Sequence, residues 1–314
     1  MILQPNSVDE LAKALSEAGA ARMRIAAFDL SALNRVLEYH PEDLTVTVQA
    51  GITLAALQAE LAKHRQWLPI DPPDPEQISI SQLLNENLSG PRRYGYGTIR
   101  EHLLGLTAVL PDGRVIHNGG KVVKNVAGFD LCKLFVGSRS TLGVIVEATF
   151  KLWPIPSGEV FLSRDFAEVK EAHSVLESIL ESEMTPVVLD LYSQAFPSCT
   201  LVLGVAGTNA EVAWQRELAK KLGFSQPTSL DHDREFWRHS VPVHRPSVLP
   251  SRLINELEEI RPETFVARAG NGIIYYRGGS PKKSAPIPEA LNRRVKEIFD
   301  PNTVLPPFDT AVSR

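Results

Sequence analysis

The stretch from residue 85 to residue 145 concentrates residue types that could surround a negatively charged ligand. Its glycines are spaced irregularly, which indicates separate turns and close approaches, and they include those at positions 90, 95, 97, 105, 119, 120, 128, 137 and 143. Arg92, Arg93, Lys121 and Lys124 are interleaved with them. Backbone N–H groups freed by glycine, together with cationic side chains, would suit a planar anionic ligand. The alternative is that these glycines form hairpin turns and that the basic side chains are solvated.

Several other chemistries lack their motifs. The P-loop and dinucleotide fingerprints both fail because a required glycine is missing, in Gly120-Lys121-Val122, Gly95-Tyr96-Gly97 and Gly270-Asn271-Gly272. The eight histidines include no H-x-H or H-x-x-x-H pair, and no serine lies in a G-x-S-x-G motif. The sequence therefore assigns no metal and no nucleophile elbow.

The composition is that of an ordinary globular protein of 314 residues, with 43% hydrophobic and 22% charged residues. Lys+Arg 33 against Asp+Glu 37 gives a net charge of -4 without a basic tract, which argues against nucleic-acid binding. Asp9 and Glu10 interrupt the position of a signal-peptide core, and no run approaches about 18 apolar residues. We therefore expect a cytoplasmic chain with no membrane span. Cys132 and Cys199 are far apart and are expected to be buried thiols.

The elements that must position the glycine-rich stretch indicate an α+β fold. A capping box at Ser7 begins a helix whose apolar residues repeat at helical spacing as far as Gly19. Residues 44–50 alternate apolar and polar side chains, as a half-buried strand does. Residues 103–117 form a hairpin around a tight Pro-Asp-Gly-Arg turn, and residues 143–153 form a long strand.

A domain boundary is expected where Pro154 and Pro156 stop this long strand. Residues 1–155 would form one domain and residues 156–314 a second. In the second half the pattern predicts strands at 187–191, 200–205, 265–269 and 273–277, and helices at 209–222 and 288–299. Both halves are therefore expected to be α+β.

Four strings, in this order, resemble the FAD-binding oxidoreductases of the vanillyl-alcohol oxidase type, which carry a PCMH-type FAD domain. They are LNRVLEYHPEDLTVTVQAGITLAALQAEL, SGPRRYGYGTIREHLLG, DGRVIHNGGKVVKNVAGFDLCKLFVGSRSTLGVI and, late in the chain, FDPNTVLPP. Within that superfamily the chain is most similar to the E subunits of bacterial glycolate oxidases, over most of residues 1–155 and more weakly beyond. The resemblance implies a PCMH-type FAD-binding domain of two α+β subdomains, followed by a C-terminal antiparallel-sheet cap domain.

The resemblance also implies which residues would hold FAD. Lying against the cofactor would be Ser89, Gly90 and Pro91. The flavin-side loop would contain Lys124, Asn125, Gly128 and Asp130. The rest of the dinucleotide would be lined by Gly137, Ser138, Thr141, Gly143 and Val144. This is chemically reasonable because glycines let backbone amides reach a pyrophosphate, while the flavin supplies the hydride chemistry.

The chain departs from the family where phosphate contacts are expected. Residues 20–36 contain no glycine where the family has a glycine-rich pyrophosphate loop, so we interpret this loop as deleted. Smaller replacements of glycine or polar residues occur at Ser81-Gln82, at Ser140 and at Leu305-Pro306-Pro307-Phe308. Because several charge-assisted donors are lost together, weak FAD binding is predicted.

Three arginines are candidates for substrate binding. The strings EFWRHSVPV and ARAGNGIIYYRGG resemble cap-domain segments in which an aromatic side chain and an arginine face the substrate. Arg238, Arg268 and Arg277 could therefore pair with a substrate carboxylate, since a guanidinium offers a bidentate fork. The alternative is that they are solvated arginines at strand ends. The metal-binding histidine pair of some family members has no recognisable counterpart.

The resemblance implies an FAD-dependent subunit that oxidises a small 2-hydroxy acid. Its partners would be a larger flavoprotein subunit and an iron-sulfur subunit, and these partners could hold it at a membrane. Two alternatives stay open: a flavin-free structural or assembly subunit of the same complex, and a stand-alone flavoenzyme with another alcohol or amine substrate. Cofactor content separates the first two hypotheses, and co-purifying partners test the third.

Overall fold

The structure is a computed structural model that describes residues 1–120, 131–239, 241–281 and 289–308. The chain divides into two compact units, each of which is described by itself. The first unit contains residues 1–89, 98–155 and 287–310, and the second contains residues 90–97, 156–286 and 311–314. The chain therefore passes between the units more than once.

The observed division departs from a simple split at residue 155 in two places. Gly90–Gly97 belongs to the second unit, although it precedes Pro156 in the sequence. Ile287–Thr310 belongs to the first unit, because Val304 and Leu305 are completely buried in the core of that unit. The last helix of the expected domain of residues 156–314 therefore belongs to the first unit.

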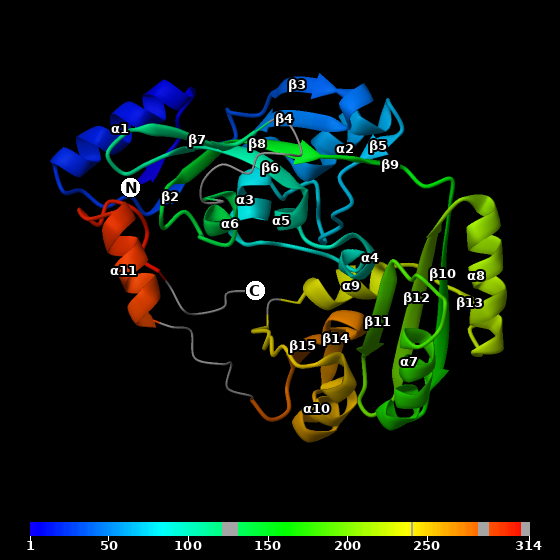
Figure 1. The fold of residues 1–314 in the computed structure, drawn as a ribbon. Helices are drawn as coiled ribbons and strands as arrows, with labels where there is room; N and C mark the ends of the chain where they lie inside the picture. Colours follow the sequence, from blue (N-terminus) through cyan, green and yellow to red (C-terminus); the bar gives the residue numbers. More distant parts are fainter. Residues whose placement is uncertain (121–130, 240, 282–288, 309–314) are drawn as a thin grey trace. The chain divides into compact units, whose positions relative to one another are not determined.

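The first unit is built on an antiparallel five-stranded sheet (Figure 1). Its strands lie in the order β3 (Val36–His40), β4 (Thr45–Gln49), β8 (Val144–Lys151), β6 (Leu103–Val109) and β7 (Val115–Gly119). Two small pairs accompany it: parallel β1 (Ile2–Leu3) with β2 (Ala27–Phe28), and antiparallel β5 (Gln66–Trp67) with β9 (Trp153–Pro154). The alternating strands and the hairpin predicted from the sequence are all present.

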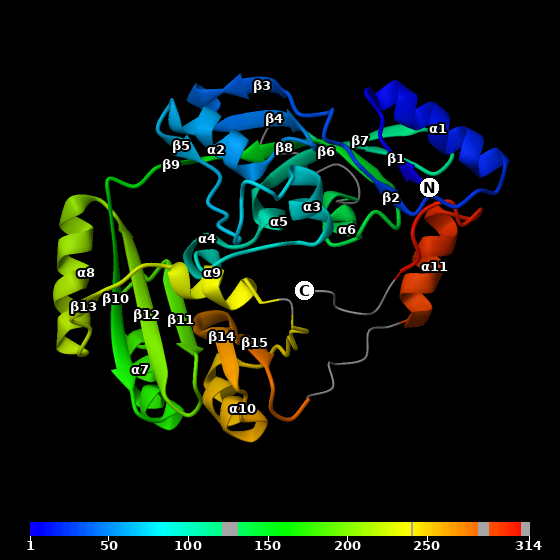
Figure 2. The ribbon, with the colours of Figure 1, turned by 180° about the vertical axis from the view of Figure 1, so that it is seen from behind.

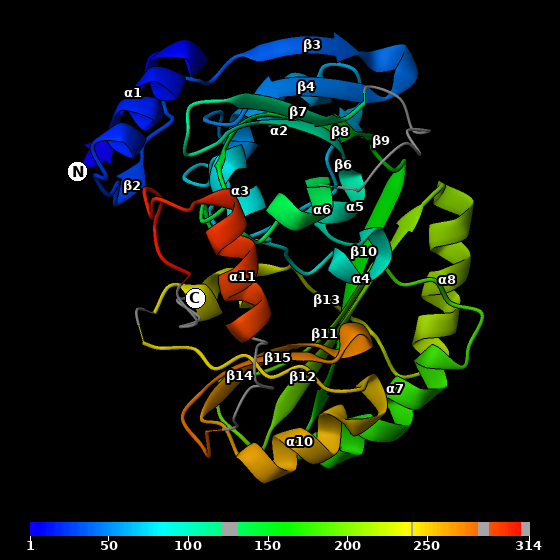
Figure 3. The same ribbon diagram turned by 60° about the vertical axis from the view of Figure 1, so that its left-hand side comes forward.

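Helices bury the apolar side chains of this unit in one core. They are α1 (Val8–Ala20), α2 (Leu54–Ala62), α3 (Ile80–Asn85), α5 (Ile99–His102), α6 (Leu131–Phe135) and α11 (Glu289–Phe299). The Ser7 side chain caps α1 by accepting from the Glu10 N–H, as predicted. Gly19 does not end this helix, which extends to Ala20 and has Ala21 as its C-cap. A Cβ at position 19 would lie 3.2 Å from the Pro111 carbonyl oxygen, so close packing explains this glycine. Helix α11 contacts α6 through Phe299 and Phe135 (Figure 3).

The second unit is built on an antiparallel six-stranded sheet (Figure 2). Its strands lie in the order β13 (Gln226–Pro227), β10 (Gly158–Phe166), β12 (Cys199–Gly207), β11 (Val188–Ser193), β14 (Thr264–Arg268) and β15 (Ile273–Arg277). Three helices contribute to the core on one face: α7 (Ala172–Leu180), α8 (Asn209–Lys221) and α10 (Leu253–Ile260). This face buries every second side chain of β11 and β14, namely Leu189 and Leu191 of β11 and Phe265 and Ala267 of β14.

The other face of this sheet is covered by α9 (Asp231–Trp237), which packs Phe236 against Val266 and Tyr275. Helix α4 (Arg93–Tyr96) contacts β11. Short 3-10 helices lie at Pro41–Asp43, Val169–Glu171, Pro250–Arg252 and Ala269–Asn271. Within the described residues, no helix has the length and apolar character needed to cross a bilayer.

Candidate functional site

The loop between α6 and β8 contains half of the predicted cofactor residues that the structure describes. Five consecutive N–H groups of this loop donate to acceptors of the first unit: Gly137 to Leu84 O (2.9 Å), Ser138 to Phe135 O (3.0 Å), Arg139 to Asn85 O (3.1 Å), Ser140 to Asn85 Oδ1 (2.8 Å) and Thr141 to Ser138 O (3.0 Å). The loop is therefore anchored to the end of α3. In this conformation these N–H groups are not free to bind a pyrophosphate.

The first turn of α3 is engaged in the same way. The N–H groups of Ile80 and Ser81 donate to the carbonyls of Ile52 (2.9 Å) and Ala50 (2.6 Å). The Gln82 N–H donates to Ser79 Oγ (3.1 Å). Ser81 and Gln82, which we interpret as replacing a glycine pair, therefore lie in the first turn of a helix, and their backbone N–H groups are already hydrogen-bonded.

The backbone of Ser140, another position where the family has a glycine, is in the left-handed conformation. Ser140 has φ 57 and its neighbour Arg139 has φ 53, so both occupy the left-handed region that favours glycine. Ser140 thus keeps the backbone shape that a glycine would adopt freely. The Asn85 side chain holds it there through the Ser140 N–H.

The deletion inferred near the N-terminus also has a structural counterpart. Residues 21–26 alone connect α1 to β2. The Ala26 N–H donates to Met1 O (2.9 Å), and the Ile25 N–H donates to Val304 O (2.8 Å). This direct connection leaves no glycine-rich phosphate loop between the helix and the strand.

Two buried polar atoms beside the 137–143 loop lack a hydrogen-bond partner among the described residues. They are Ser138 Oγ and Asn87 Oδ1. Gly137 lies next to Asn87, because a Cβ at Gly137 would be 3.8 Å from the Asn87 Cβ and would meet nothing closer. Buried polar groups are almost always paired, so unpaired ones fit polar groups of a ligand. Ser138, Asn87 and Gly137, which we call the polar corner, therefore fit a polar cofactor such as FAD.

The remaining predicted residues of this loop serve the protein itself. The Thr141 hydroxyl donates to Ser138 O (2.7 Å), and the Thr141 carbonyl accepts from Lys296 Nζ (2.8 Å). A Cβ at Gly143 would lie 2.9 Å from the Phe135 ring, and Val144 is fully buried. Packing therefore explains the glycine at 143, and the Val144 side chain belongs to the core.

The other predicted cofactor residues fall in two places. Ser89 ends a segment of the first unit, whereas Gly90 and Pro91 begin the Gly90–Gly97 segment of the second. Outside the described residues lie Lys124, Asn125, Gly128 and Asp130.

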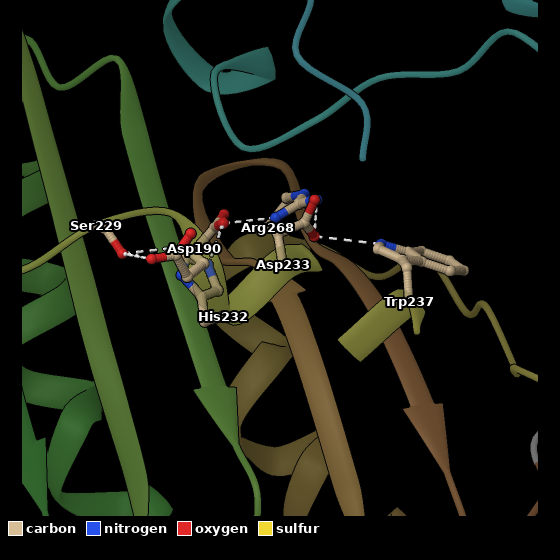
Figure 4. Close-up of polar contacts among 7 residues, drawn as sticks. Asp190, Ser229, His232, Asp233, Trp237 and Arg268 are labelled. Carbon is tan, nitrogen blue, oxygen red and sulfur yellow. Dashed lines mark hydrogen bonds and ion pairs between the residues drawn. The ribbon is translucent and has the colours of Figure 1, made fainter. Parts of the chain in front are cut away.

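Arg268 is the centre of a buried ion-pair network in the second unit (Figure 4). Its Nη1 lies 2.5 Å from Asp190 Oδ2, and its Nη2 lies 2.6 Å from Asp233 Oδ1. Burial alone would lower the pKa of Arg268, but the two carboxylates outweigh it and raise the pKa. The expectation that Arg268 binds substrate is corrected here, because Asp190 and Asp233 already occupy its guanidinium.

His232 extends this network. Its Nε2 lies 3.1 Å from Asp190 Oδ2, and its ring stacks on Tyr192 with centroids 4.7 Å apart. The Trp237 Nε1–H donates to Asp233 (3.2 Å). Sequence reasoning missed Asp190, His232 and Asp233. A usable signal was present, because Asp190 interrupts the apolar run VVLDL, and an aspartate in a buried strand needs a cationic partner.

The other two arginines line one cavity. It has a volume of about 450 Å³ and is bounded by β11, β14, β15 and α9. Arg238 lies on its exposed rim, whereas Arg277 is buried. Across the described parts of the chain, no group of three or more His, Cys, Asp or Glu side chains could hold a metal ion.

Comparisons with known proteins agree with the resemblance seen in the sequence. Residues 26–119 match the model of the FAD binding domain family. The chain is 39% identical to the glycolate oxidase subunit GlcD of Bacillus subtilis over 166 residues, which are 52% of this chain and 34% of that protein. It is 33% identical to the glycolate oxidase subunit GlcE of Escherichia coli over 184 residues, 58% of this chain and 51% of that protein.

A probable mitochondrial D-lactate dehydrogenase of Danio rerio is 36% identical over 158 residues, 49% of this chain and 31% of that protein. These alignments span about a third to a half of the relatives' own lengths. Among solved structures, an alkyldihydroxyacetonephosphate synthase matches with a TM-score of 0.72 at 20% identity, covering 96% of this chain and 75% of that one. At this identity the match concerns the fold alone.

Together these findings confirm the predicted α+β class, and residues 26–119 match the predicted kind of domain, an FAD binding domain. The chain contains a PCMH-type FAD-binding domain, and FAD is the cofactor that the family and the relatives support. Glycolate oxidase subunits and D-lactate dehydrogenases are among its relatives.

Proposed function

We propose that this chain is an FAD-binding subunit of a glycolate oxidase-like oxidoreductase that oxidises a small 2-hydroxy acid. The observation that carries the proposal is the FAD binding domain match at residues 26–119, in a chain related to glycolate oxidase subunits and D-lactate dehydrogenases. Bound FAD would supply the hydride acceptor. Among the described residues, the polar corner of Ser138, Asn87 and Gly137 would bind polar groups of the cofactor.

The proposed partners are a larger flavoprotein subunit and an iron-sulfur subunit. Two relatives are named as subunits of glycolate oxidase, which supports a multi-subunit assembly. This chain has only two cysteines, both buried, which are too few to ligate an iron-sulfur cluster. Electrons would therefore leave through another subunit. Co-purification of an affinity-tagged chain with two such proteins tests this step.

The cofactor site that we propose is the polar corner of the first unit. The family resemblance also implies a cofactor contact for Ser89, which lies in the same unit. Gly143 is a poor test position, since any side chain there would collide with Phe135 and disturb the core. Ser138→Ala is better, because it removes one unpaired hydroxyl and little volume.

Titration of flavin-free protein with FAD tests the proposal. The engaged N–H groups of the 137–141 loop and of α3 leave fewer donors for the pyrophosphate, so we expect a dissociation constant of about 10⁻⁶ M or weaker. Ser138→Ala should weaken binding by about threefold to tenfold. The matched control is Ser178→Ala, an exposed serine of α7. Equal FAD affinity in wild type and Ser138→Ala would remove Ser138 from the site.

A second candidate function is a flavin-free structural or assembly subunit of the same complex. The engaged N–H groups favour it, because they include every backbone donor from Gly137 to Thr141. If FAD does not bind at millimolar concentration while the chain still joins its partners, this second function replaces the first.

A further inference from the structure

The turn from Ser138 to Thr141 directs two successive backbone N–H groups at one residue. The Thr141 N–H closes the turn on Ser138 O (3.0 Å), and the two central residues have φ 53 and φ 57. The Arg139 N–H donates to the Asn85 carbonyl (3.1 Å), and the Ser140 N–H donates to Asn85 Oδ1 (2.8 Å). Successive N–H groups that converge in a turn form a concavity suited to an anion. In this chain the concavity contains Asn85.

The Asn85 side chain is held in the orientation that this contact needs. It is 7% exposed, and its Nδ2 donates to Ser81 Oγ (3.2 Å), four residues earlier on α3. Because the amide nitrogen is bonded to Ser81, the amide oxygen faces the Ser140 N–H. The carboxamide oxygen of Asn85 therefore lies where an oxygen atom of a bound anion would accept the same hydrogen bond.

The surroundings of the turn are those of a ligand site. Gly137 is exposed and Ser140 is partly exposed, so a ligand can reach this part of the loop. The Ser138 side chain, which belongs to the polar corner, is 6% exposed, and its hydroxyl has no hydrogen-bond partner among the described residues. A ligand on the polar corner would therefore lie within two residues of the Ser140 N–H.

We infer that Asn85 limits the affinity of this chain for FAD, because its carboxamide takes the N–H that a phosphate group of the cofactor would use. The inference rests on the proposed function, in which the polar corner of the same loop binds FAD. A phosphate oxygen forms a stronger hydrogen bond than a neutral amide oxygen, but displacing Asn85 would leave its buried amide oxygen unpaired. Removing the carboxamide should therefore strengthen FAD binding. A purely structural role predicts the opposite, since losing two hydrogen bonds would loosen the loop.

The first test is calorimetric titration of flavin-free wild type and Asn85→Ala with FAD. We expect Asn85→Ala to bind FAD about threefold to tenfold more tightly, because one N–H becomes available to a charged acceptor. The matched control is Asn85→Asp, which keeps an acceptor oxygen for the Ser140 N–H and adds a negative charge. This variant should bind FAD no more tightly than wild type. Equal or weaker FAD binding by folded Asn85→Ala would overturn the inference.

A second variant covers the case in which Asn85→Ala does not fold. Ser81→Ala removes the acceptor that orients the carboxamide, so it should strengthen FAD binding by a smaller factor of about two. If this variant binds FAD no better than wild type, Asn85 does not limit the affinity.

Inorganic pyrophosphate provides a probe that contains no flavin. We expect it to shift the Ser140 amide resonance in NMR spectra of Asn85→Ala, and to leave the same resonance of wild type unchanged at equal concentration. An unchanged Ser140 resonance in both proteins would contradict the inference. If FAD binds to none of the proteins, the proposed function fails, whereas the Ser140 resonance still decides whether Asn85 closes an anion site.

Discussion

At the scale of single residues, the two buried arginines of the second unit differ in what neutralises them. Arg268 is held between Asp190 and Asp233, all three side chains being at most 3% exposed. Such a network is costly to assemble but still more costly to break, because removing one partner leaves a charge buried and unpaired. Arg268 is therefore a structural residue of this face of the sheet.

Asp190→Asn should destabilise the protein strongly. It removes a carboxylate from Arg268 and from His232, and the expected loss is about 3 to 5 kcal/mol of unfolding free energy. Urea unfolding followed by circular dichroism measures it. Asp231→Asn, an exposed neighbour at the start of α9, should change stability by less than about 1 kcal/mol. Comparable losses in the two variants would contradict the role given to the network.

Cys199 should resist alkylation in the folded state. Burial, followed by the nearby Glu171 and Asp165 charges, raises the pKa of its thiol to about 12. Because the folded pKa is raised, this contribution to stability is complete below the unfolded thiol pKa of about 8.5 and is lost as the pH rises toward 12. At pH 8, iodoacetamide should label Cys199 only after unfolding, as peptide mass spectrometry would show. Labelling at the rate of a free thiol would refute this.

At the scale of elements, the Gly90–Gly97 segment is fixed into the second unit by two close approaches. A Cβ at Gly270 would lie 2.1 Å from the Tyr94 ring, and a Cβ at Gly95 would lie 2.6 Å from the Val187 Cα. Neither glycine has a positive φ. Both are therefore needed for space, which supports the close-approach interpretation for part of the glycine-rich stretch.

Gly270→Ala should force Tyr94 out of its position. The added methyl group collides with a half-buried ring, so we expect a loss of about 1 to 3 kcal/mol. In a Tyr94→Ala background the same change should cost much less, because the ring is gone. A double-mutant cycle by urea unfolding measures this coupling. Additive effects of the two substitutions would show that Tyr94 does not determine the need for glycine at 270.

Asp300, which directly follows α11 and is 1% exposed, links the end of this helix to the segment that follows it. Its carboxylate accepts from Lys296 Nζ (2.5 Å) and from the N–H groups of Val304 and Leu305 (both 2.9 Å). Asp300→Ala should therefore cost about 3 to 5 kcal/mol, because it leaves Lys296 without its counter-ion. Hydrogen exchange should also accelerate at the Ile25 N–H, which donates to Val304 O. Unchanged exchange there would mean that Asp300 does not hold this segment.

At the scale of the whole molecule, local patterns predicted what depends on neighbours in sequence. The strands at residues 44–50 and 143–153 and the hairpin between residues 103 and 117 follow from periodicity and turn chemistry, and the structure confirms them. The inference of a deleted loop rests on residues 20–36, which contain no glycine. The family resemblance also supplied the antiparallel cap, which no local pattern specifies.

Long-range pairing accounts for what the sequence could not predict. Asp190 and Arg268 are 78 residues apart, and Lys296 and Thr141 are 155 apart, so no pattern within one segment links them. The packing of α11 in the first unit could not be predicted for the same reason, because α11 is far in sequence from the rest of that unit. Arg268 and Arg277 looked equivalent in sequence because their difference lies entirely in the side chains that fold around them.

The return of residues 287–310 to the first unit also sets an order of events during synthesis. Val304 and Leu305 are needed to fill the core of the unit that begins at Met1. The core of the N-terminal unit can therefore be completed only after residues 156–286 of the second unit have been synthesised, and until then this core stays accessible to proteases and chaperones.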